Sequence, residues 1–204
     1  MTRVLAISGS IRAQSFNTAL LHALPALAPE GMTIEVFKGI DELPHFNQDL
    51  EADVPASVVR LREAIQAADG VIISTPEYNR SVPGVLKNAL DWASRPYGQS
   101  SWFGKPVAAL SASPGPQGGG IRAQEELRSQ LRNLGAYVVH GPEIAVTEVH
   151  SRLSVDEQAR VTLNDPATAG MAKFLLAALD DAVRANTGGT HVKSLGAWMT
   201  SLAG

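Results

Sequence analysis

The chain has 204 residues, a formal net charge of −3, 45% hydrophobic residues and no cysteine. This length and hydrophobic content predict one large domain, and the lack of cysteine excludes disulfides, thiolate metal sites and a cysteine nucleophile. The weakly acidic balance offers no basic surface for nucleic acid or a membrane. A strand pattern follows Met1 directly and no apolar run is long enough to span a membrane, so a cytoplasmic protein is expected.

The first half of the chain alternates apolar runs with helical patterns. It begins with a predicted strand at Val4–Ile7, a helix from Ser15 to about Leu27 and a second strand at Thr33–Phe37. A helix is predicted after Pro55, and a third strand follows at Gly70–Ser74. Short, nearly continuous apolar runs of this kind are typical of parallel strands that are buried on both faces.

The second half continues this alternation. A third helix begins near Pro83, a residue that suits a first helical turn, and leads to a fourth strand at Val107–Leu110. The fourth helix has apolar residues at spacings of three and four over Ala123–Leu134, before a fifth strand at Ala136–Val139. A last helix is centred on Met171–Ala178.

Strands that alternate with helices predict an α/β fold. We expect a doubly wound, five-stranded parallel sheet of the flavodoxin type, with strand order 2-1-3-4-5 and helices on both faces. The one break in composition is Asn186–Thr190, which should end the last helix. Residues 1–185 are therefore predicted to form the domain, and residues 186–204 a C-terminal tail that is either mobile or a docking helix.

The first predicted strand leads into a loop of small residues and then into a helix. This stretch, Gly9–Asn17, contains one arginine, Arg12, and the hydroxyl groups of Ser10 and Ser15. The amides and the dipole of a helix N-terminus favour an anion, and the arginine can add a charge-assisted contact. The loop therefore favours a phosphate site. An ordinary strand-to-helix turn with Ser15 as its N-cap is the alternative that needs no ligand.

Two more polar loops follow the third and fourth strands, at residues 75–84 and 111–120. Ligands of open parallel sheets bind outside the carboxyl ends of the strands, where the strand order reverses, so all three loops should meet at one edge. The Glu77–Asn79 segment suits a planar heterocycle, or is a turn whose tyrosine packs on a neighbour. The Gly118–Gly120 segment allows a close ligand approach, or is a flexible helix entry.

At these loops the chain resembles the NADPH-dependent FMN reductase family, notably its bacterial chromate- and quinone-reducing members. The resemblance rests on Gly9–Asn17 and on the more specific block Thr75–Gly84, which continues as Leu86–Arg95. The segment Leu43–Glu51 also looks like the family's loop after the second strand. The resemblance covers roughly residues 3–184, which is most of the chain.

The resemblance implies a flavodoxin-like domain that binds FMN noncovalently. It implies no catalytic side chain and no metal ligand of the protein. The implied cofactor-binding residues are Ser10, Arg12, Ser15 and Asn17 for the phosphate, with Phe16 in the same loop; Pro76, Glu77, Tyr78, Asn79 and Arg80 along the isoalloxazine; and Ser113, Gly115, Gly118 and Gly119 on its other side.

The family also implies a homodimer or homotetramer, with the Lys87–Arg95 helix as a contact element. Two features depart from the family. Arg80 stands where an aromatic residue is common, so the open face of the flavin should be more cationic, unless this arginine is simply solvated. The tail after Asn186 has no recognised counterpart.

The implied activity is an FMN-dependent NAD(P)H oxidoreductase. In a ping-pong cycle, NADPH or NADH reduces the flavin and leaves, and a flavin, quinone, chromate or similar acceptor takes the electrons. One alternative is a flavodoxin-like electron carrier without an NAD(P)H site. Another is a serine hydrolase with Ser8 or Ser10 as nucleophile and His150 as base, although the chain lacks a Gly-x-Ser-x-Gly elbow.

Metal binding and a ligand role for the tryptophan of the third helix have weaker support. The five histidines show no paired spacing typical of metal ligands, and no cysteine can assist them. Trp92 lies on an apolar helix, where packing in the core or at an interface is favoured over stacking on a ligand.

Overall fold

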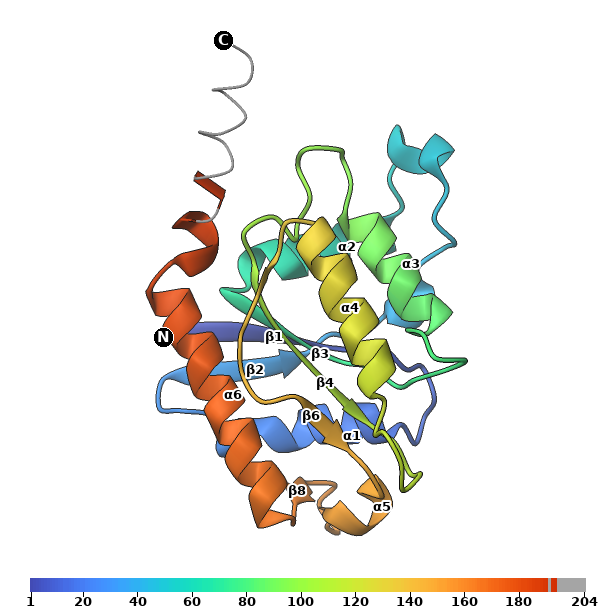
Figure 1. Ribbon diagram of the computed structural model, residues 1–204. Coiled ribbons are helices and arrows are strands. Elements are labelled where there is room, and N and C mark those ends of the chain that lie inside the picture. The colour runs from blue at the N-terminus through green and yellow to red at the C-terminus, as the bar shows by residue number, and fades with distance from the viewer. Residues whose placement is uncertain (191, 194–204) are drawn as a thin grey trace.

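The computed structural model describes residues 1–190, 192 and 193. Its main sheet has the strand order β2-β1-β3-β4-β5, with helices on both faces (Figure 1). The pairs β1–β2, β1–β3, β3–β4 and β4–β5 are all parallel. This confirms the predicted flavodoxin-like fold.

The elements alternate as expected over most of the chain. The strands are β1 (Thr2–Ser8), β2 (Met32–Val36), β3 (Gly70–Ser74), β4 (Pro106–Ala112), β5 (Tyr137–Val138), β6 (Ile144–Val146), β7 (Leu153–Val155) and β8 (Val161–Leu163). The helices are α1 (Phe16–Ala23), α2 (Ala56–Ala67), α3 (Gly84–Ala93), α4 (Ile121–Asn133), α5 (Val149–Arg152) and α6 (Pro166–Arg184), with short 3-10 turns at Leu24–Leu27, Ile40–Glu42 and Gln48–Glu51.

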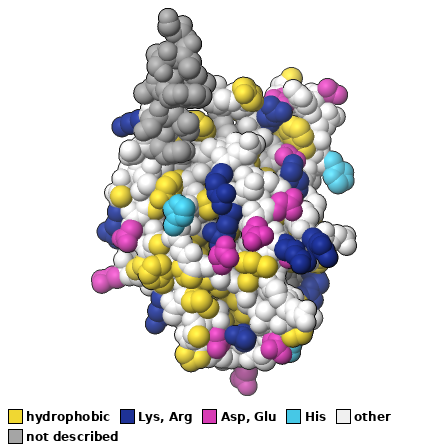
Figure 2. Space-filling model, in the orientation of Figure 1, with side chains coloured by type: hydrophobic (Ala, Val, Ile, Leu, Met, Phe, Trp, Pro, Cys, Tyr) yellow, Lys and Arg dark blue, Asp and Glu magenta, His cyan; other side chains and the backbone are white. Residues whose placement is uncertain are grey.

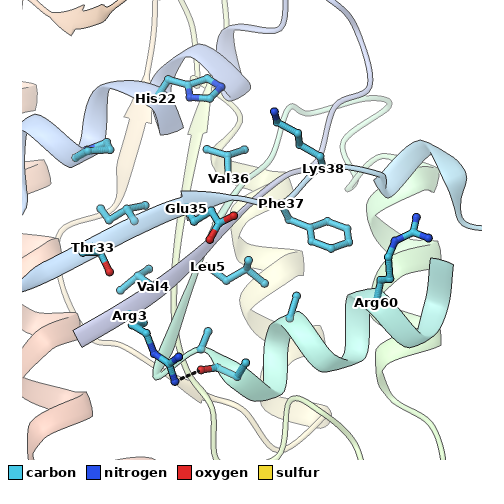
Figure 3. A pocket seen from close by; sticks show the side chains of 15 residues that line it. Arg3, Val4, Leu5, His22, Thr33, Glu35, Val36, Phe37, Lys38 and Arg60 are labelled. Atoms are coloured by element: carbon cyan, nitrogen blue, oxygen red, sulfur yellow. Dashed lines mark hydrogen bonds between the residues drawn. The ribbon is translucent and has the colours of Figure 1, made fainter. Parts of the chain in front are cut away.

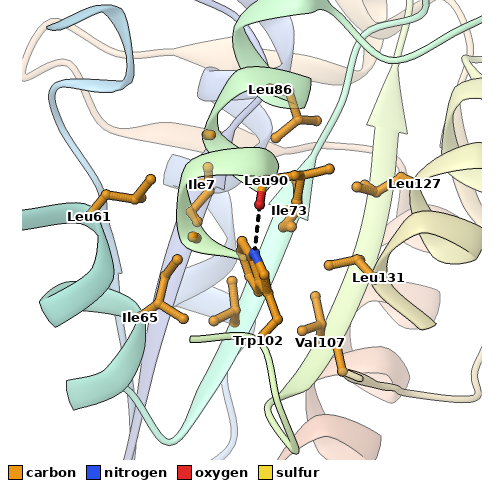
Figure 4. Close-up of a cluster of buried hydrophobic side chains, with 14 of the residues drawn as sticks. Ile7, Leu61, Ile65, Ile73, Leu86, Leu90, Trp102, Val107, Leu127 and Leu131 are labelled. Atoms are coloured by element: carbon orange, nitrogen blue, oxygen red, sulfur yellow. Dashed lines mark hydrogen bonds between the residues drawn. The ribbon is translucent and has the colours of Figure 1, made fainter. Parts of the chain in front are cut away.

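The sheet is buried on both faces, which explains its continuous apolar strands. Successive side chains of a strand point to opposite faces, so Ile7 and Ile73 belong to one core cluster while Ala6 and Ile72 belong to the other. The first cluster lies under α2, α3 and α4 and includes the fully buried Trp102 (Figure 4). The second is covered by α1 and α6. Burying each large aliphatic side chain contributes about 1.5–3 kcal/mol.

The fifth strand needs a correction, because it is split in two. β5 pairs with Pro106 and Val107 of β4, whereas β6 pairs with β4 from Leu110 to Ala112. Between them lies Gly141-Pro142, and proline has no amide hydrogen for a strand ladder. Strand β6 and the antiparallel β7–β8 hairpin were not predicted from the sequence.

The last helix forms where it was predicted, but two of its apolar residues face outward. Leu175 is 1% exposed, whereas Met171 and Phe174 are 38% and 62% exposed. Figure 2 shows hydrophobic side chains on the face of the molecule that α6 crosses. No helix of the described residues is long and apolar enough to cross a membrane.

Residues 187–190 at the start of the predicted tail are helical. Gly188 packs so closely against the Gly104 carbonyl that a Cβ at Gly188 would lie 1.7 Å from that oxygen. Only a residue without a side chain allows this approach. The rest of the predicted tail, residue 191 and residues 194–204, lies outside the described residues, so its mobile or docking character stays a prediction.

Candidate functional site

The carboxyl ends of β1, β3 and β4 lie side by side, and each continues into one of the three polar loops (Figure 1). The Gly9 amide donates to the Ser74 carbonyl at 2.7 Å, and the Thr75 amide donates to the Leu110 carbonyl at 3.0 Å. These bonds extend the strand ladders into the loops. The structure therefore brings the three predicted site segments to one edge of the sheet.

Asn17 fastens the first loop to the other two strands. Its side chain is 3% exposed. Its Oδ1 accepts from Ser74 Oγ at 2.8 Å and from the Ala112 amide at 3.0 Å, and its Nδ2 donates to the Ala112 carbonyl at 3.0 Å. The side chain is thus committed to protein partners. What Asn17 can still offer a ligand is its backbone amide in the first turn of α1.

The first loop presents a cation beside the N-terminus of α1. Ser15 is the N-cap, and its Oγ accepts from the Thr18 amide at 3.3 Å. The exposed Arg12 has its guanidinium carbon 5.3 Å from the centre of the Phe16 ring, and no carboxylate of the described residues forms an ion pair with it. Ser10 Oγ accepts from the Arg12 amide at 3.4 Å. A free arginine next to a helix N-terminus fits a phosphate group.

The second loop contains a tight two-residue turn. The Tyr78 and Ser81 backbones exchange hydrogen bonds of 3.1 and 3.0 Å around Asn79 and Arg80, whose φ angles are 52° and 68°. Positive φ at both central residues is the mark of a type I′ turn, which favours Asn first and Gly second. Arg80 is therefore held in a conformation that costs about 1–2 kcal/mol.

This turn exposes the side chains that were predicted to lie along a planar ring. Tyr78 is 53% exposed, and Asn79 and Arg80 are exposed as well. The Tyr78 amide is used within the turn, whereas the amides of Glu77 and Asn79 have no protein acceptor among the described residues. Pro76 is buried at the start of the loop, so its side chain faces the protein interior.

Glu77 points away from the turn and toward α4. Its Oε2 accepts from the amides of Arg122 and Ala123 at 3.2 and 3.4 Å. The N-cap of α4 is Gly120, which has no side chain to bond these amides, so Glu77 takes that role from another loop. A carboxylate there also complements the helix dipole. Glu77 thus joins the second loop to the third.

The glycines of the third loop divide into two pairs. A Cβ at Gly119 would lie 2.6 Å from backbone atoms of Ala145, and one at Gly120 would lie 2.9 Å from the Ser111 Cβ. These two glycines are required by packing against the sheet. Gly118 has no atom within 4 Å of the same position, and Gly115 has only Ser113 Oγ at 3.5 Å. Gly115 and Gly118 leave open space for a ligand to approach.

A segment that was not predicted braces this third loop. The Ser113 amide donates to the Val146 carbonyl at 2.9 Å, and the Gly115 carbonyl accepts from the Glu148 amide at 3.1 Å. The sequence marks this brace only by the apolar run Ile144–Val146 after the interrupting glycine and proline, and three residues are too few to predict a strand.

The structure also explains the specific motif of α3. Asn88 donates through Nδ2 to the Pro44 carbonyl at 2.9 Å and accepts from the Phe46 amide at 2.7 Å. Trp92 is fully buried, and its Nε1 donates to the same Pro44 carbonyl at 2.8 Å. These residues hold the loop after β2 onto α3. Trp92 is therefore a core residue within the chain, as its apolar helix indicated.

The hydrolase alternative finds no support in the geometry. Ser8 is 6% exposed, and its Oγ lies 2.7 Å from Thr18 Oγ1. In the part of the chain that the structure describes, no histidine forms a hydrogen bond with Ser8 or Ser10. A serine nucleophile needs such a base.

Two cavities lie elsewhere in the molecule. One of about 720 Å³ opens at the free edge of β2, between His22 of α1 and Arg60 of α2 (Figure 3). The other, of about 480 Å³, lies at the break between β5 and β6. Neither includes a residue of the three loops, so the candidate site is defined by the convergence of the loops.

The chain is similar to known proteins in both sequence and fold. The chain matches the sequence model of the NADPH-dependent FMN reductase family over residues 2–151. It is 44% identical over 154 residues to a 2-hydroxy-1,4-benzoquinone reductase of a Burkholderia species, which covers 76% of this chain and 83% of that protein. It is 45% identical over 166 residues to an NAD(P)H-dependent FMN reductase of Pseudomonas aeruginosa, covering 81% and 86%. A solved structure, the flavoenzyme NAD(P)H:(acceptor) oxidoreductase FerB from Paracoccus denitrificans, superposes with a TM-score of 0.81 at 38% identity, covering 91% and 99%.

Proposed function

The chain belongs to the NADPH-dependent FMN reductase family, and on this premise we propose that FMN binds noncovalently where the three loops meet. The protein is an NAD(P)H-dependent oxidoreductase of the FMN reductase and quinone reductase type, with FMN and NAD(P)H as its cofactors. This confirms the family and the activity expected from the sequence motifs. The roles of individual residues, the acceptor and the order of binding belong to the proposal.

The observation that carries the proposed site is that hydrogen bonds of Asn17 join the first loop, which favours an anion, to the strand ends that lead into the second and third loops. Arg12 and the first amides of α1 would hold the phosphate, with the Ser10 and Ser15 hydroxyls beside them. The bonds of Asn17 to Ser74 and Ala112 set the distance from this phosphate position to the second and third loops. The position of the phosphate thereby determines where the ring lies.

The ring would lie between the Tyr78–Arg80 turn and the open side of Gly115 and Gly118. FMN held there would supply the redox chemistry, namely hydride uptake from the nucleotide and electron transfer to the acceptor. The free amides of Glu77 and Asn79 can donate to ring acceptors and favour negative charge there. Glu77 keeps this loop in place through its bonds to α4.

Arg80 gives the open face a positive charge. Its exposed position on the turn suits an anionic group of the incoming nucleotide, or an anionic acceptor such as chromate. The nucleotide and the acceptor would bind there one after the other, which is the ping-pong order. A quinone-type acceptor has the best support, since one of the similar proteins is a benzoquinone reductase. Cytoplasmic location and a homodimer or homotetramer with α3 at the contact stay predictions.

The test is reconstitution with FMN, followed by anaerobic addition of NADPH or NADH and then of a benzoquinone. We expect retained flavin absorbance, bleaching by at least one nucleotide, and recovery with the quinone. Initial rates at varied nucleotide and quinone should give parallel reciprocal plots. Flavin that is retained but not bleached would favour the electron carrier instead. Failure to retain flavin at all would overturn the proposed site.

A further inference from the structure

A cavity lies at the break in the fifth strand, beside the second half of α4 and away from the glycine loop that precedes this helix. The cavity measures about 480 Å³ and is lined by the second half of α4 and by the chain around the break, with Arg128, Arg132, Tyr137, His140 and Glu143 among its walls. Two of these five side chains are arginines and one is a histidine. The cavity shares no residue with the three loops of the candidate flavin site.

Arg128 is the buried residue of this cavity. It is 7% exposed, and its Nη2 donates to the Ala109 carbonyl at 3.2 Å and to Gln124 Oε1 at 3.1 Å. Ala109 lies opposite the break, between the β4 residues that pair with β5 and those that pair with β6. The guanidinium thus bonds a β4 carbonyl that has no strand partner at the break. Only Nη2, one of its three nitrogens, takes part in these bonds.

Arg128 has no ion-pair partner among the described residues, although Glu143 lines the same cavity. The Arg128 Nε is buried without a hydrogen-bond acceptor. Burial lowers the pKa of Arg128; the charge of Glu143 opposes this shift and that of Arg132 adds to it. Arginine nevertheless keeps its proton in proteins. A buried charge without a partner is costly, and an anion in the cavity would remove that cost.

The rim of the cavity is suited to the same anion. Arg132 and His140 are exposed on it, and neither forms an ion pair with a described residue. Glu143 is the one carboxylate among the lining residues, against two arginines. Arginine binds the oxygens of phosphate and carboxylate through two parallel N–H groups. The chemistry of the cavity therefore fits a small oxyanion.

A buried chain of hydrogen bonds leads from Arg128 to the glycine loop. Gln124, one helical turn before Arg128, donates through Nε2 to Ser111 Oγ at 2.7 Å and to the Ile144 carbonyl at 2.8 Å. Ser111 Oγ donates in turn to the Gly119 carbonyl at 2.7 Å. Gln124 and Ser111 are both fully buried. Each link is therefore shielded from competition with water.

We propose that the cavity at the β5–β6 break binds a small oxyanion of the phosphate class, and that its occupancy strengthens FMN binding through the chain Arg128–Gln124–Ser111–Gly119. The anion fixes the guanidinium, which holds Gln124 and Ser111 in the arrangement that supports the third loop. The coupling half of this inference rests on the proposed FMN site, whereas the anion site itself does not. Coupling of this kind is reciprocal, so FMN strengthens anion binding by the same factor.

The binding test uses the FMN-loaded protein, so that the flavin phosphate already occupies the Arg12 loop. Inorganic phosphate is titrated by calorimetry, with sodium chloride of equal ionic strength as the reference. We expect one phosphate per chain. Arg132→Gln should weaken its binding by about tenfold or more, as loss of a charge-assisted contact does. Arg60→Gln, which removes an exposed arginine of the other cavity that is paired with Glu42, should leave it unchanged. Absence of phosphate binding, or equal effects of the two variants, overturns the site.

The coupling test measures the FMN dissociation constant with and without phosphate. Phosphate in the cavity should lower this constant about fivefold or more. Phosphate that competes for the Arg12 loop would raise it, so the sign separates the two sites. Gln124→Met should retain phosphate binding and lose the effect on FMN, and Ser111→Ala serves as a second variant if the first does not fold. Phosphate that binds without changing FMN affinity overturns the coupling. Failure of the proposed function would show separately, as wild-type protein that retains no FMN in either buffer.

Discussion

Asn17 and Ser74, which are 57 residues apart in the chain, are joined by a hydrogen bond of 2.8 Å between Asn17 Oδ1 and Ser74 Oγ. The same oxygen also accepts from the Ala112 amide, so one side chain connects the first turn of α1 to the ends of β3 and β4. Hydrogen bonds within the protein thereby hold three loops that a ligand would contact in one arrangement. This preorganisation is what a cofactor site requires.

Asn17→Ala should both destabilise the protein and weaken FMN binding. It removes three buried hydrogen bonds and leaves the Ala112 backbone groups unpaired, which should cost about 2–4 kcal/mol of unfolding free energy. Urea unfolding of the apoprotein measures this loss. Ser74→Ala, which removes one of the three bonds, should cost about 1 kcal/mol. Equal losses for the two variants would contradict the role of Asn17 as the connector.

Arg12→Ala should weaken FMN binding without affecting the apo fold. Arg12 is exposed and bonds no carboxylate of the described residues, so its removal leaves no protein group unpaired. Loss of a charge-assisted contact to phosphate corresponds to about a tenfold to hundredfold rise in the dissociation constant. Fluorescence titration with FMN measures it, and riboflavin, which lacks the phosphate, should bind both proteins equally. An unchanged FMN affinity would refute the phosphate assignment.

Glu77→Ala should loosen the connection between the second loop and α4. The helix loses the carboxylate that caps its first amides, at a cost of about 0.5–2 kcal/mol. Glu77→Gln keeps an oxygen acceptor at the same place and should lose less stability. Thermal unfolding of the apoproteins and FMN titration together test this. If Ala and Gln behave alike in both measurements, capping is not what Glu77 contributes.

Arg80→Gly should separate the backbone strain of the turn from the charge of its side chain. Glycine accepts the φ of 68° without strain, so Arg80→Gly should be more stable than Arg80→Ala by up to about 1 kcal/mol. Both variants lose the positive charge, so both should raise the KM for NADPH to the same extent. Chemical denaturation and steady-state kinetics provide the two readouts. A KM that neither variant changes would assign Arg80 to the solvated surface.

Asp180 should make the protein sensitive to acid. Burial by itself raises the pKa of this carboxyl, but hydrogen bonds from Thr2 and Arg184 outweigh that effect and hold the pKa below its ordinary value. The stabilisation is therefore fully present above the ordinary aspartate pKa of about 3.9 and is lost as the pH falls through the lower folded value. Thr2→Val removes one donor and should raise the pKa of Asp180 in the folded protein. As the pH falls, this variant should therefore begin to lose stability at a higher pH than the wild type. Unfolding free energies measured from pH 6 to pH 3 test this, and identical pH profiles would refute it.

The sheet and its helices could be predicted because their signals are local. Buried parallel strands such as Gly70–Ser74 are apolar along their whole length, and helices repeat apolar residues every three or four positions. The split fifth strand was missed because Ile144–Val146 is only three residues long, too short for a periodic signal. Its pairing with β4 depends on the tertiary register, which no short window of sequence contains.

The sequence by itself determined that the three polar loops of the candidate site meet at one edge of the sheet, because the order of strands and the composition of the loops are both readable along the chain. Only the tertiary structure decided what each side chain does there. It turned Asn17 toward Ser74 and Ala112, Glu77 toward α4, and Gly119 toward Ala145. Each of these partners is between 26 and 95 residues away in the chain, and such contacts form only when separate elements pack. Residue type restricts which bonds are possible, and packing selects the ones that are made.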